Sequence, residues 1–152
     1  MNATEPALPD DGCAFCAIAQ EKLPASVVLA DPLILAFLDL RQYHPGHVLV
    51  IPREHVPDIR AVDDATATAL MLALARIARA VDRTFPNDGL SVWHSAGAGA
   101  NQEVPHLHFH VHPRYFGDDV LRVYPGPPAY PDRARLDDWA GRLRAALGRI
   151  AG

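Results

Sequence analysis

Four histidines stand at every second position of one short stretch: His106, His108, His110 and His112. Apolar side chains stand between them, and such strict alternation predicts a β-strand with imidazoles on one face and a core on the other. Neighbours on the imidazole face lie about 6.6–7 Å apart along the strand, so a metal ion or a phosphate can contact two or three of them. Each neutral ring needs partners for one donor and one acceptor, which makes such a face costly unless something uses it.

Two kinds of chemistry fit this pattern. Alternating histidines on a strand can chelate zinc or copper. Alternatively, one imidazole can attack an electrophile while its neighbours manage charge and protons. A solvated strand face that is rich in histidine by accident is the simplest explanation and the least favoured. The spacing alone does not separate the first two interpretations.

Both cysteines of the chain lie in one Cys-x-x-Cys motif, Cys13 and Cys16. Two cysteines exclude a disulfide scaffold, and the motif indicates half of a zinc site or a redox pair. A redox pair needs a strand before the motif, whereas residues 1–12 are polar and predicted to form a flexible tail. Zinc is therefore favoured, with burial as small apolar residues as the remaining alternative. His55 is the candidate third ligand.

Composition limits the classes of protein to be considered. The 152 residues carry a formal charge of −4 and no basic run, which argues against a nucleic-acid surface. No apolar run reaches the length of a membrane span, and no basic-then-apolar leader is present. We therefore expect a cytoplasmic protein that has neither nucleic acid nor membrane as a partner.

Hydrophobic periodicity predicts an α+β fold with a largely antiparallel five-stranded sheet and two main helices. Strands are expected at 26–30, 33–38, 47–52, 90–94 and 106–112, and helices at 15–22, 63–84 and 133–150. Asp39 ends the second strand, where a carboxylate can either bind a vicinal diol or form a turn. The small-residue loop from Ser95 to Asn101 leads into the histidines, and such loops let backbone N–H groups approach an anion.

These residues resemble the histidine-triad (HIT) family of nucleotide hydrolases and transferases. The resemblance rests on 106–112, with Gln102 and Val104 before it and Pro113-Arg114-Tyr115 after it. It extends through 37–39, 45–52 and 54–55 and reaches back to Cys13. It implies a HIT-like fold, a single domain over 13–152 with a C-terminal helix, and a homodimer.

The resemblance also implies roles for individual residues. His108 would attack the α-phosphorus of a nucleotide and form a covalent nucleotidyl-histidine. His110 would contact the phosphate and help to protonate the leaving group, and Gln102 would bind the phosphoryl oxygens. The implied substrate-binding residues are Phe15, Phe37, Leu38 and Leu49 at the base, Asp39 at the ribose, and Ser95, Asn101, Glu103 and Val104 beside the phosphate.

Family members with the same cysteine pair hold a structural zinc ion, and the matching ligands are Cys13, Cys16, His55 and His106. His112 falls where the family does not require histidine. Three departures bear on the substrate: Ser95 and Ala96 stand where the family usually has Asn, Asn101 where it has Gly, and Glu103 where phosphoramidases have Ser.

The expected activity is cleavage at the α-phosphate of a purine nucleoside phosphate. The candidate substrates are a dinucleoside polyphosphate, a nucleoside phosphoramidate and an acyl adenylate. The alternative is a HIT-fold protein that binds nucleotide or zinc without catalysis.

Overall fold

The computed structural model describes residues 12–150, so the predicted tail lies almost wholly outside the described residues. The contacts divide the chain into two units, the first ending at Val120 and the second beginning at Leu121. The two units are described separately. The expectation of one domain over 13–152 stays a prediction.

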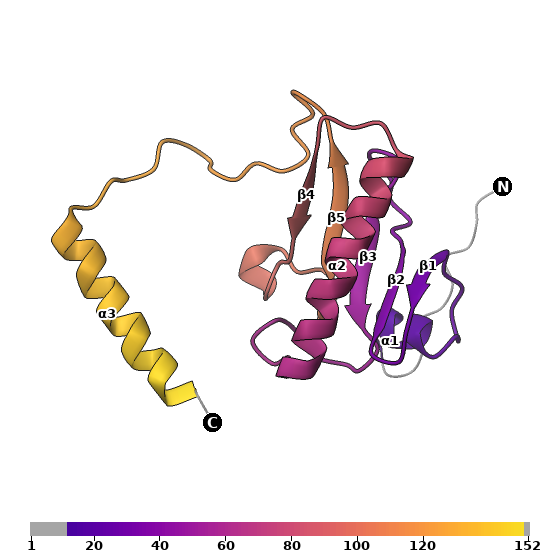
Figure 1. Cartoon of the computed structure of the whole chain (residues 1–152), viewed down its shortest axis with the longest axis horizontal. Helices are drawn as coiled ribbons and strands as arrows, with labels where there is room; N and C mark the ends of the chain where they lie inside the picture. The colour runs from indigo at the N-terminus through magenta and orange to yellow at the C-terminus, as the bar shows by residue number, and fades with distance from the viewer. Residues whose placement is uncertain (1–11, 151–152) are drawn as a thin grey trace. The chain divides into compact units, whose positions relative to one another are not determined.

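The first unit contains a five-stranded antiparallel sheet in the order β1-β2-β3-β5-β4 (Figure 1). The strands are β1 Val27–Ala30, β2 Ile34–Leu38, β3 Val48–Pro52, β4 Gly89–Trp93 and β5 Phe109–Arg114. β5 lies between β3 and β4, where His110 is paired with Leu49 on one side and Trp93 on the other. The predicted α+β fold with two main helices is confirmed.

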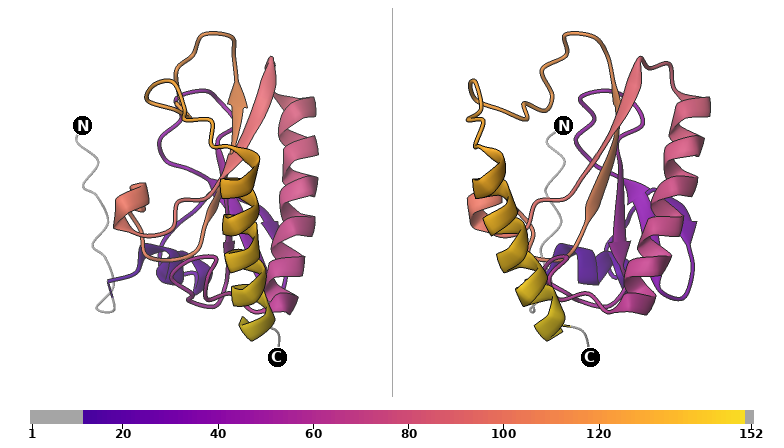
Figure 2. Two further views of the ribbon diagram at one scale, coloured as in Figure 1. Left: turned by 90° about the vertical axis from the view of Figure 1, so that its left-hand side faces the viewer. Right: turned by 60° about the vertical axis from the view of Figure 1, so that its left-hand side comes forward.

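Helix α2, Asp64–Thr84, covers one face of the sheet (Figure 2). Its N-cap is Asp63, whose side chain accepts a hydrogen bond from the Thr66 amide at 3.0 Å. The apolar positions of α2 recur at helical spacing and pack against alternate residues of β2, β3 and β5. The buried members from the helix are Leu70, Ala73, Leu74, Ile77 and Val81.

The other face of the sheet carries the short helix α1, Ala14–Ala19, and the 3₁₀ turn η1, Ala98–Ala100 (Figure 2). Phe15 and Cys16 of α1 pack in a second apolar cluster with residues of β2 and β3. Since Val111 belongs to the core on the α2 side, strand alternation places His110 and His112 on the α1 side.

One predicted strand begins later than the sequence indicated. β5 starts at Phe109, so His106 and His108 precede the strand and do not belong to it. The antiparallel register would pair Leu107 with Pro52, which has no N–H to donate. The Leu107 amide instead donates to the Val56 carbonyl at 2.6 Å. The first two histidines therefore lie in a turn that departs from the sheet.

The second unit contains α3, Arg133–Ile150, with the bounds predicted from its apolar repeat. Its apolar side chains are exposed: Leu136, Trp139, Leu143, Leu147 and Ile150. Among the described residues, no helix combines the length and apolar character needed to cross a membrane.

Candidate active site and metal cluster

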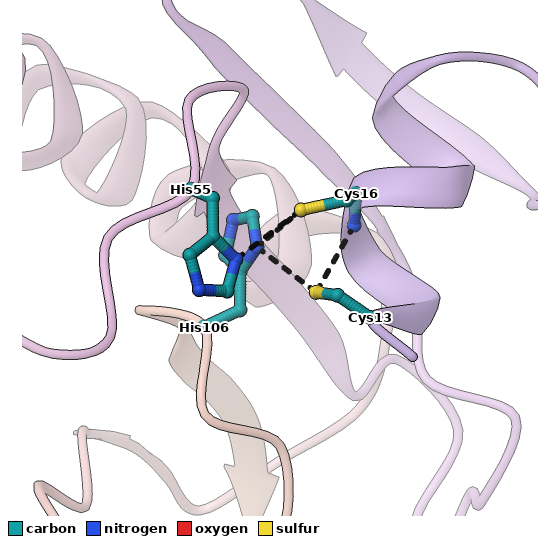
Figure 3. Close-up of side chains that lie close together, drawn as sticks. All are labelled: Cys13, Cys16, His55 and His106. Carbon is teal, nitrogen blue, oxygen red and sulfur yellow. Dashed lines mark hydrogen bonds between the residues drawn. The ribbon is translucent and has the colours of Figure 1, made fainter. Parts of the chain in front are cut away.

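Two cysteines and two histidines converge beside α1, and they are the four predicted metal ligands (Figure 3). The ligand atoms of Cys13, Cys16, His55 and His106 all lie within 4.8 Å of one another. The Nδ1 atom of His106 is 3.5 Å from each cysteine Sγ, and the Nδ1 atom of His55 is 3.2 Å from Cys16 Sγ. In a tetrahedral zinc site, neighbouring ligand atoms are about 3.3–3.8 Å apart. This arrangement could hold a metal ion.

The buried His106 ring is oriented by a backbone carbonyl. Its Nε2 atom donates to the Pro52 oxygen at 2.8 Å. A carbonyl oxygen can only accept, so Nε2 carries the proton and Nδ1 presents a lone pair to the sulfurs. Burial lowers the pKa of His106, which favours the neutral ring that a metal ligand requires.

His108 is oriented in the opposite way. Its Nδ1 donates to the His106 carbonyl at 2.6 Å, so the lone pair of the neutral ring is on Nε2. Burial lowers the pKa of His108, and the edge of Phe15 packs on it with ring centroids 5.2 Å apart. A neutral imidazole with a fixed tautomer is a competent nucleophile near pH 7.

His110 begins a short hydrogen-bond chain through a histidine that the sequence reasoning did not single out. The Nδ1 atom of His47 donates to the Arg41 carbonyl at 3.1 Å, and its Nε2 accepts from Nδ1 of His110 at 2.9 Å. The free lone pair of His110 is therefore on Nε2. Burial, with smaller contributions from neighbouring imidazoles, lowers the pKa of His110 to about 3.

Trp93 lies flat against His110, with ring centroids 4.4 Å apart and planes 7° apart. The sheet register produces this stack, because Trp93 of β4 and His110 of β5 are directly paired. The face of an indole ring attracts a cation, so Trp93 favours the protonated form of His110 whenever that form is needed. The sequence held a usable signal, since antiparallel pairing places the two strand residues on one face.

His94 supports the carbonyl of His108. Its Nδ1 donates to that oxygen at 2.8 Å, and its Nε2 accepts from the Ile59 amide at 3.4 Å. His94 thus joins the loop after β3 to the turn that carries His108. Sequence reasoning treated His94 only as the end of a strand.

The amide of Gln102 connects two loops. Its Oε1 accepts from the Gly97 amide at 2.7 Å, and its Nε2 donates to the Pro57 carbonyl at 2.6 Å. The amides of Asn101 and Gln102 are also bonded within the loop, to Ala98 and Gly97. The Nε2 group carries a second hydrogen, which a phosphoryl oxygen can accept without displacing either bond.

The residues expected at the base of a nucleotide are only partly brought together. Phe15, Phe37 and Leu49 pack in the cluster on the α1 side, and Val104 contacts it. Leu38 does not join them and packs against the core on the α2 side. The reason is strand geometry, because consecutive residues of β2 face opposite sides.

The polar residues expected around the substrate occupy several loops. Ser95 lies between β4 and η1, and Asn101 ends η1 in the left-handed conformation at φ 61°. Asp39 follows β2, is buried, and accepts from the Arg41 amide at 2.8 Å. Two roles were predicted for Asp39, turn former and diol ligand, and they are compatible because they use different oxygens. Oδ1 makes this turn bond, while Oδ2 lies 3.7 Å from Nδ1 of His47.

His112 is buried outside the metal cluster, and its Nδ1 donates to the Pro113 carbonyl at 2.6 Å. Its ring lies beside His47 with centroids 4.7 Å apart. Among the alternating histidines, His106 therefore faces sulfur, His108 and His110 keep free Nε2 atoms, and His112 is enclosed.

Comparisons with known proteins agree with this arrangement. A family model described as the HIT domain matches residues 20–117. An uncharacterized HIT-like protein of Borreliella burgdorferi is 40% identical over 108 residues, which are 70% of this chain and 78% of that protein. An adenosine 5'-monophosphoramidase of Schizosaccharomyces pombe is 31% identical over 119 residues, which are 78% of this chain and 85% of that protein. A crystal structure from Streptococcus mutans UA159 superposes with a TM-score of 0.82 at 33% identity, covering 93% of this chain and 87% of the other.

The first unit is an α+β protein fold with an open antiparallel sheet, and its histidines and Cys/His cluster lie on the side opposite α2. The chain belongs to the HIT family, as the matched residues span well over half of it. Some members of this family are adenosine monophosphate phosphoramidases.

Proposed function

We propose that the protein is a nucleotidyl hydrolase or transferase that cleaves the bond between the α-phosphate of a purine nucleotide and its leaving group. The observation that carries this proposal is the state of His108. Its Nδ1 proton is held by the His106 carbonyl at 2.6 Å, and burial lowers its pKa. The neutral Nε2 atom is therefore available to attack phosphorus.

The reaction proceeds in two displacements. In the first, the Nε2 lone pair of His108 forms a bond to the α-phosphorus, and the bond to the leaving group breaks with its electron pair on the departing atom. His110 delivers a proton to that atom. In the second, a water oxygen attacks phosphorus, the phosphorus–nitrogen bond breaks, and His108 regains its lone pair. The water proton restores the charge of His110, and the nucleoside monophosphate leaves.

His110 acquires its proton only when the substrate is present. In the free protein its pKa is about 3, so the ring is neutral at pH 7. An anionic phosphate beside the ring favours the charged form and raises this pKa. The stacked Trp93 ring favours the same form. His47 accepts from the other nitrogen of His110 and keeps the ring in place.

The loop before β5 supplies donors for the phosphoryl oxygens. The amides of Asn101 and Gln102 are bonded within this loop. Among the described residues, the structure gives the amides of Glu103 and Val104 no hydrogen-bond partner, so both are available as donors. Ser95, Asn101 and Gln102 shape the loop that presents them, while Asp39 binds the ribose hydroxyls.

The cluster of Cys13, Cys16, His55 and His106 is proposed to hold a structural zinc ion. Four protein ligands of this type leave no open position for substrate. When bound, zinc would fix α1 and the turn that contains His106, and through the His106 carbonyl the orientation of His108. The need for reduced thiols supports a cytoplasmic location. From its likeness to the family we also propose a homodimer, which light scattering after size-exclusion chromatography can test.

Intact-protein mass spectrometry tests the proposal. The protein is mixed briefly with adenosine phosphoramidate and quenched at alkaline pH, which preserves a phosphorus–nitrogen bond. We expect an increment of one adenylyl group that is absent from His108→Ala. Nucleotide binding without an adduct, and without release of AMP over hours, would indicate a binding protein in place of an enzyme.

A further inference from the structure

Arg41 and Glu103 form an ion pair between two loops that border the histidines. Arg41 Nη2 lies 2.9 Å from Glu103 Oε2, and Nη1 lies 3.3 Å from Oε1, so the guanidinium contacts both carboxylate oxygens. The two residues are 62 positions apart in the chain. The pair therefore joins the loop after β2 to the loop before β5.

The ion pair lies within electrostatic range of the proposed reaction centre. The Arg41 charge contributes to lowering the pKa of His110, and the Glu103 charge acts in the opposite direction on His108. Arg41 Nε is also 3.7 Å from Oδ1 of Asp39, the proposed ribose ligand. The Arg41 guanidinium thus lies between the carboxylates of Asp39 and Glu103, where the ribose and the phosphate are expected.

This pair can open at small cost. The side chains of Arg41 and Glu103 are 71% and 67% exposed. Exposed ion pairs contribute little to stability, and water can solvate both charges when they separate. The ion pair between Arg114 and Asp118 provides a contrast, because the Asp118 side chain is only 3% exposed. A charged ligand can therefore replace either partner in the Arg41–Glu103 pair.

The charges must be balanced again once a nucleotide is bound. An α-phosphate attracts Arg41 away from Glu103, because both anions compete for one guanidinium. Glu103 then keeps a negative charge beside the leaving group. A leaving group with a positive charge restores the balance, whereas one with additional phosphates places like charges together.

We propose that Arg41 and Glu103 determine substrate specificity by the charge of the leaving group. Arg41 moves to the α-phosphate, and Glu103 binds an ammonium group carried by the leaving amine. This inference rests on the proposed function and specifies its substrate class as an adenylyl compound whose leaving group is cationic. It also gives a physical role to the exposed carboxylate of Glu103.

Three adenosine 5'-phosphoramidates that differ only in the charge of the amine test the inference. The amines are 1,3-diaminopropane, butylamine and 4-aminobutanoate, and the measured quantity is kcat/KM from released AMP. For the native protein we expect the cationic compound to exceed the anionic one by about tenfold, with a smaller ratio at high salt. In Glu103→Gln the ratio should fall to about one. In Arg41→Gln all three rates should fall together.

Asp82→Asn is the matched control, because it removes one exposed carboxylate from α2, on the opposite face of the sheet. It should keep the native ratio. Equal kcat/KM values for the three compounds, or a ratio that Glu103→Gln does not change, would overturn the inference and leave the proposed function standing. A preference for the anionic compound that is lost in Arg41→Gln would overturn it as well. Absence of AMP from all three compounds, together with absence of an adduct, would contradict the proposed function itself.

Discussion

The Cys/His cluster and the proposed reaction centre use histidine side chains in opposite ways. His106 donates from Nε2 to the Pro52 carbonyl and presents Nδ1 to two sulfurs. His108, two positions later, donates from Nδ1 to the His106 carbonyl and keeps Nε2 free. Backbone carbonyls thus decide which nitrogen carries the lone pair. Position relative to the carbonyls, more than residue type, separates the proposed ligand from the proposed nucleophile.

The two regions also differ in how closed they are. The cluster brings four donor atoms together, with His106 and Cys13 buried and only His55 exposed. The reaction centre is bordered by exposed charges and by the partly exposed ring of Trp93. Changes in the cluster should therefore affect mainly stability, and changes in the reaction centre mainly turnover.

The largest effect on stability is expected from Cys16→Ser. Loss of one thiolate should remove bound zinc and lower the free energy of unfolding by about 3 kcal/mol, which corresponds to a fall in Tm of about 10 °C. Zinc content by atomic absorption and Tm by calorimetry measure this. His108→Ala is the comparison variant, with native zinc content and no adduct. Native Tm and zinc content in Cys16→Ser would show that the cluster is not a metal site.

Trp93→Leu should have a smaller effect, confined to turnover. Without the stacked indole, His110 is less easily protonated in the substrate complex, and kcat should fall about tenfold, or about 1.4 kcal/mol, with little change in KM. Steady-state kinetics with adenosine phosphoramidate measures this. Trp93→Phe keeps an aromatic face and should recover part of the loss. Equal kcat values for Trp93→Leu and Trp93→Phe would exclude the proposed role of the indole face.

The smallest effect concerns pH and stability. The unfolded chain protonates His110 below about pH 6.5, whereas the folded protein does so only near the lowered pKa of about 3. The unfolded state therefore binds more protons between these values, and the free energy of unfolding falls as pH falls. Because the ring is partly exposed and coupled to His47, we expect a loss of about 1 kcal/mol between pH 7 and 5.

Urea titrations at the two pH values measure this loss. His110→Gln is the reference, since it removes the titrating ring and leaves the other residues of the proposed reaction centre in place. The native protein should lose about 1 kcal/mol more than this variant. Identical losses would show that the low pKa of His110 does not contribute to acid sensitivity.

Most of the fold could be predicted because apolar spacing determines it. Helices α2 and α3 and strands β2 to β4 lie within one residue of their predicted bounds. The start of β5 could not be predicted from its own alternation, since it depends on Pro52 in the neighbouring strand. Leu38 could have been assigned correctly, because the period of a strand separates it from Phe37.

The convergence of the cluster residues could be predicted because the family resemblance names them, whereas residues to which that resemblance assigns no role were missed. The four cluster residues do converge, as the family resemblance implied. His47, Trp93 and His94 reach the reaction centre through sheet pairing and loop contacts that lie far apart in sequence. The Arg41–Glu103 pair likewise joins two loops, and no local pattern indicates it.

The cluster has a further consequence for local unfolding of the first unit. Cys13 and His106 are 93 positions apart, so their contact closes one of the longest loops of the first unit. Helix α1 has 6 residues, too few to be stable in isolation. Both faces of the sheet need residues from either side of this loop, since Leu107 and Val111 belong to the core on the α2 side. The α2 face, however, gains a helix of 21 residues, whereas the opposite face gains one of 6. We therefore expect the surface proposed to carry the chemistry to open first by local unfolding.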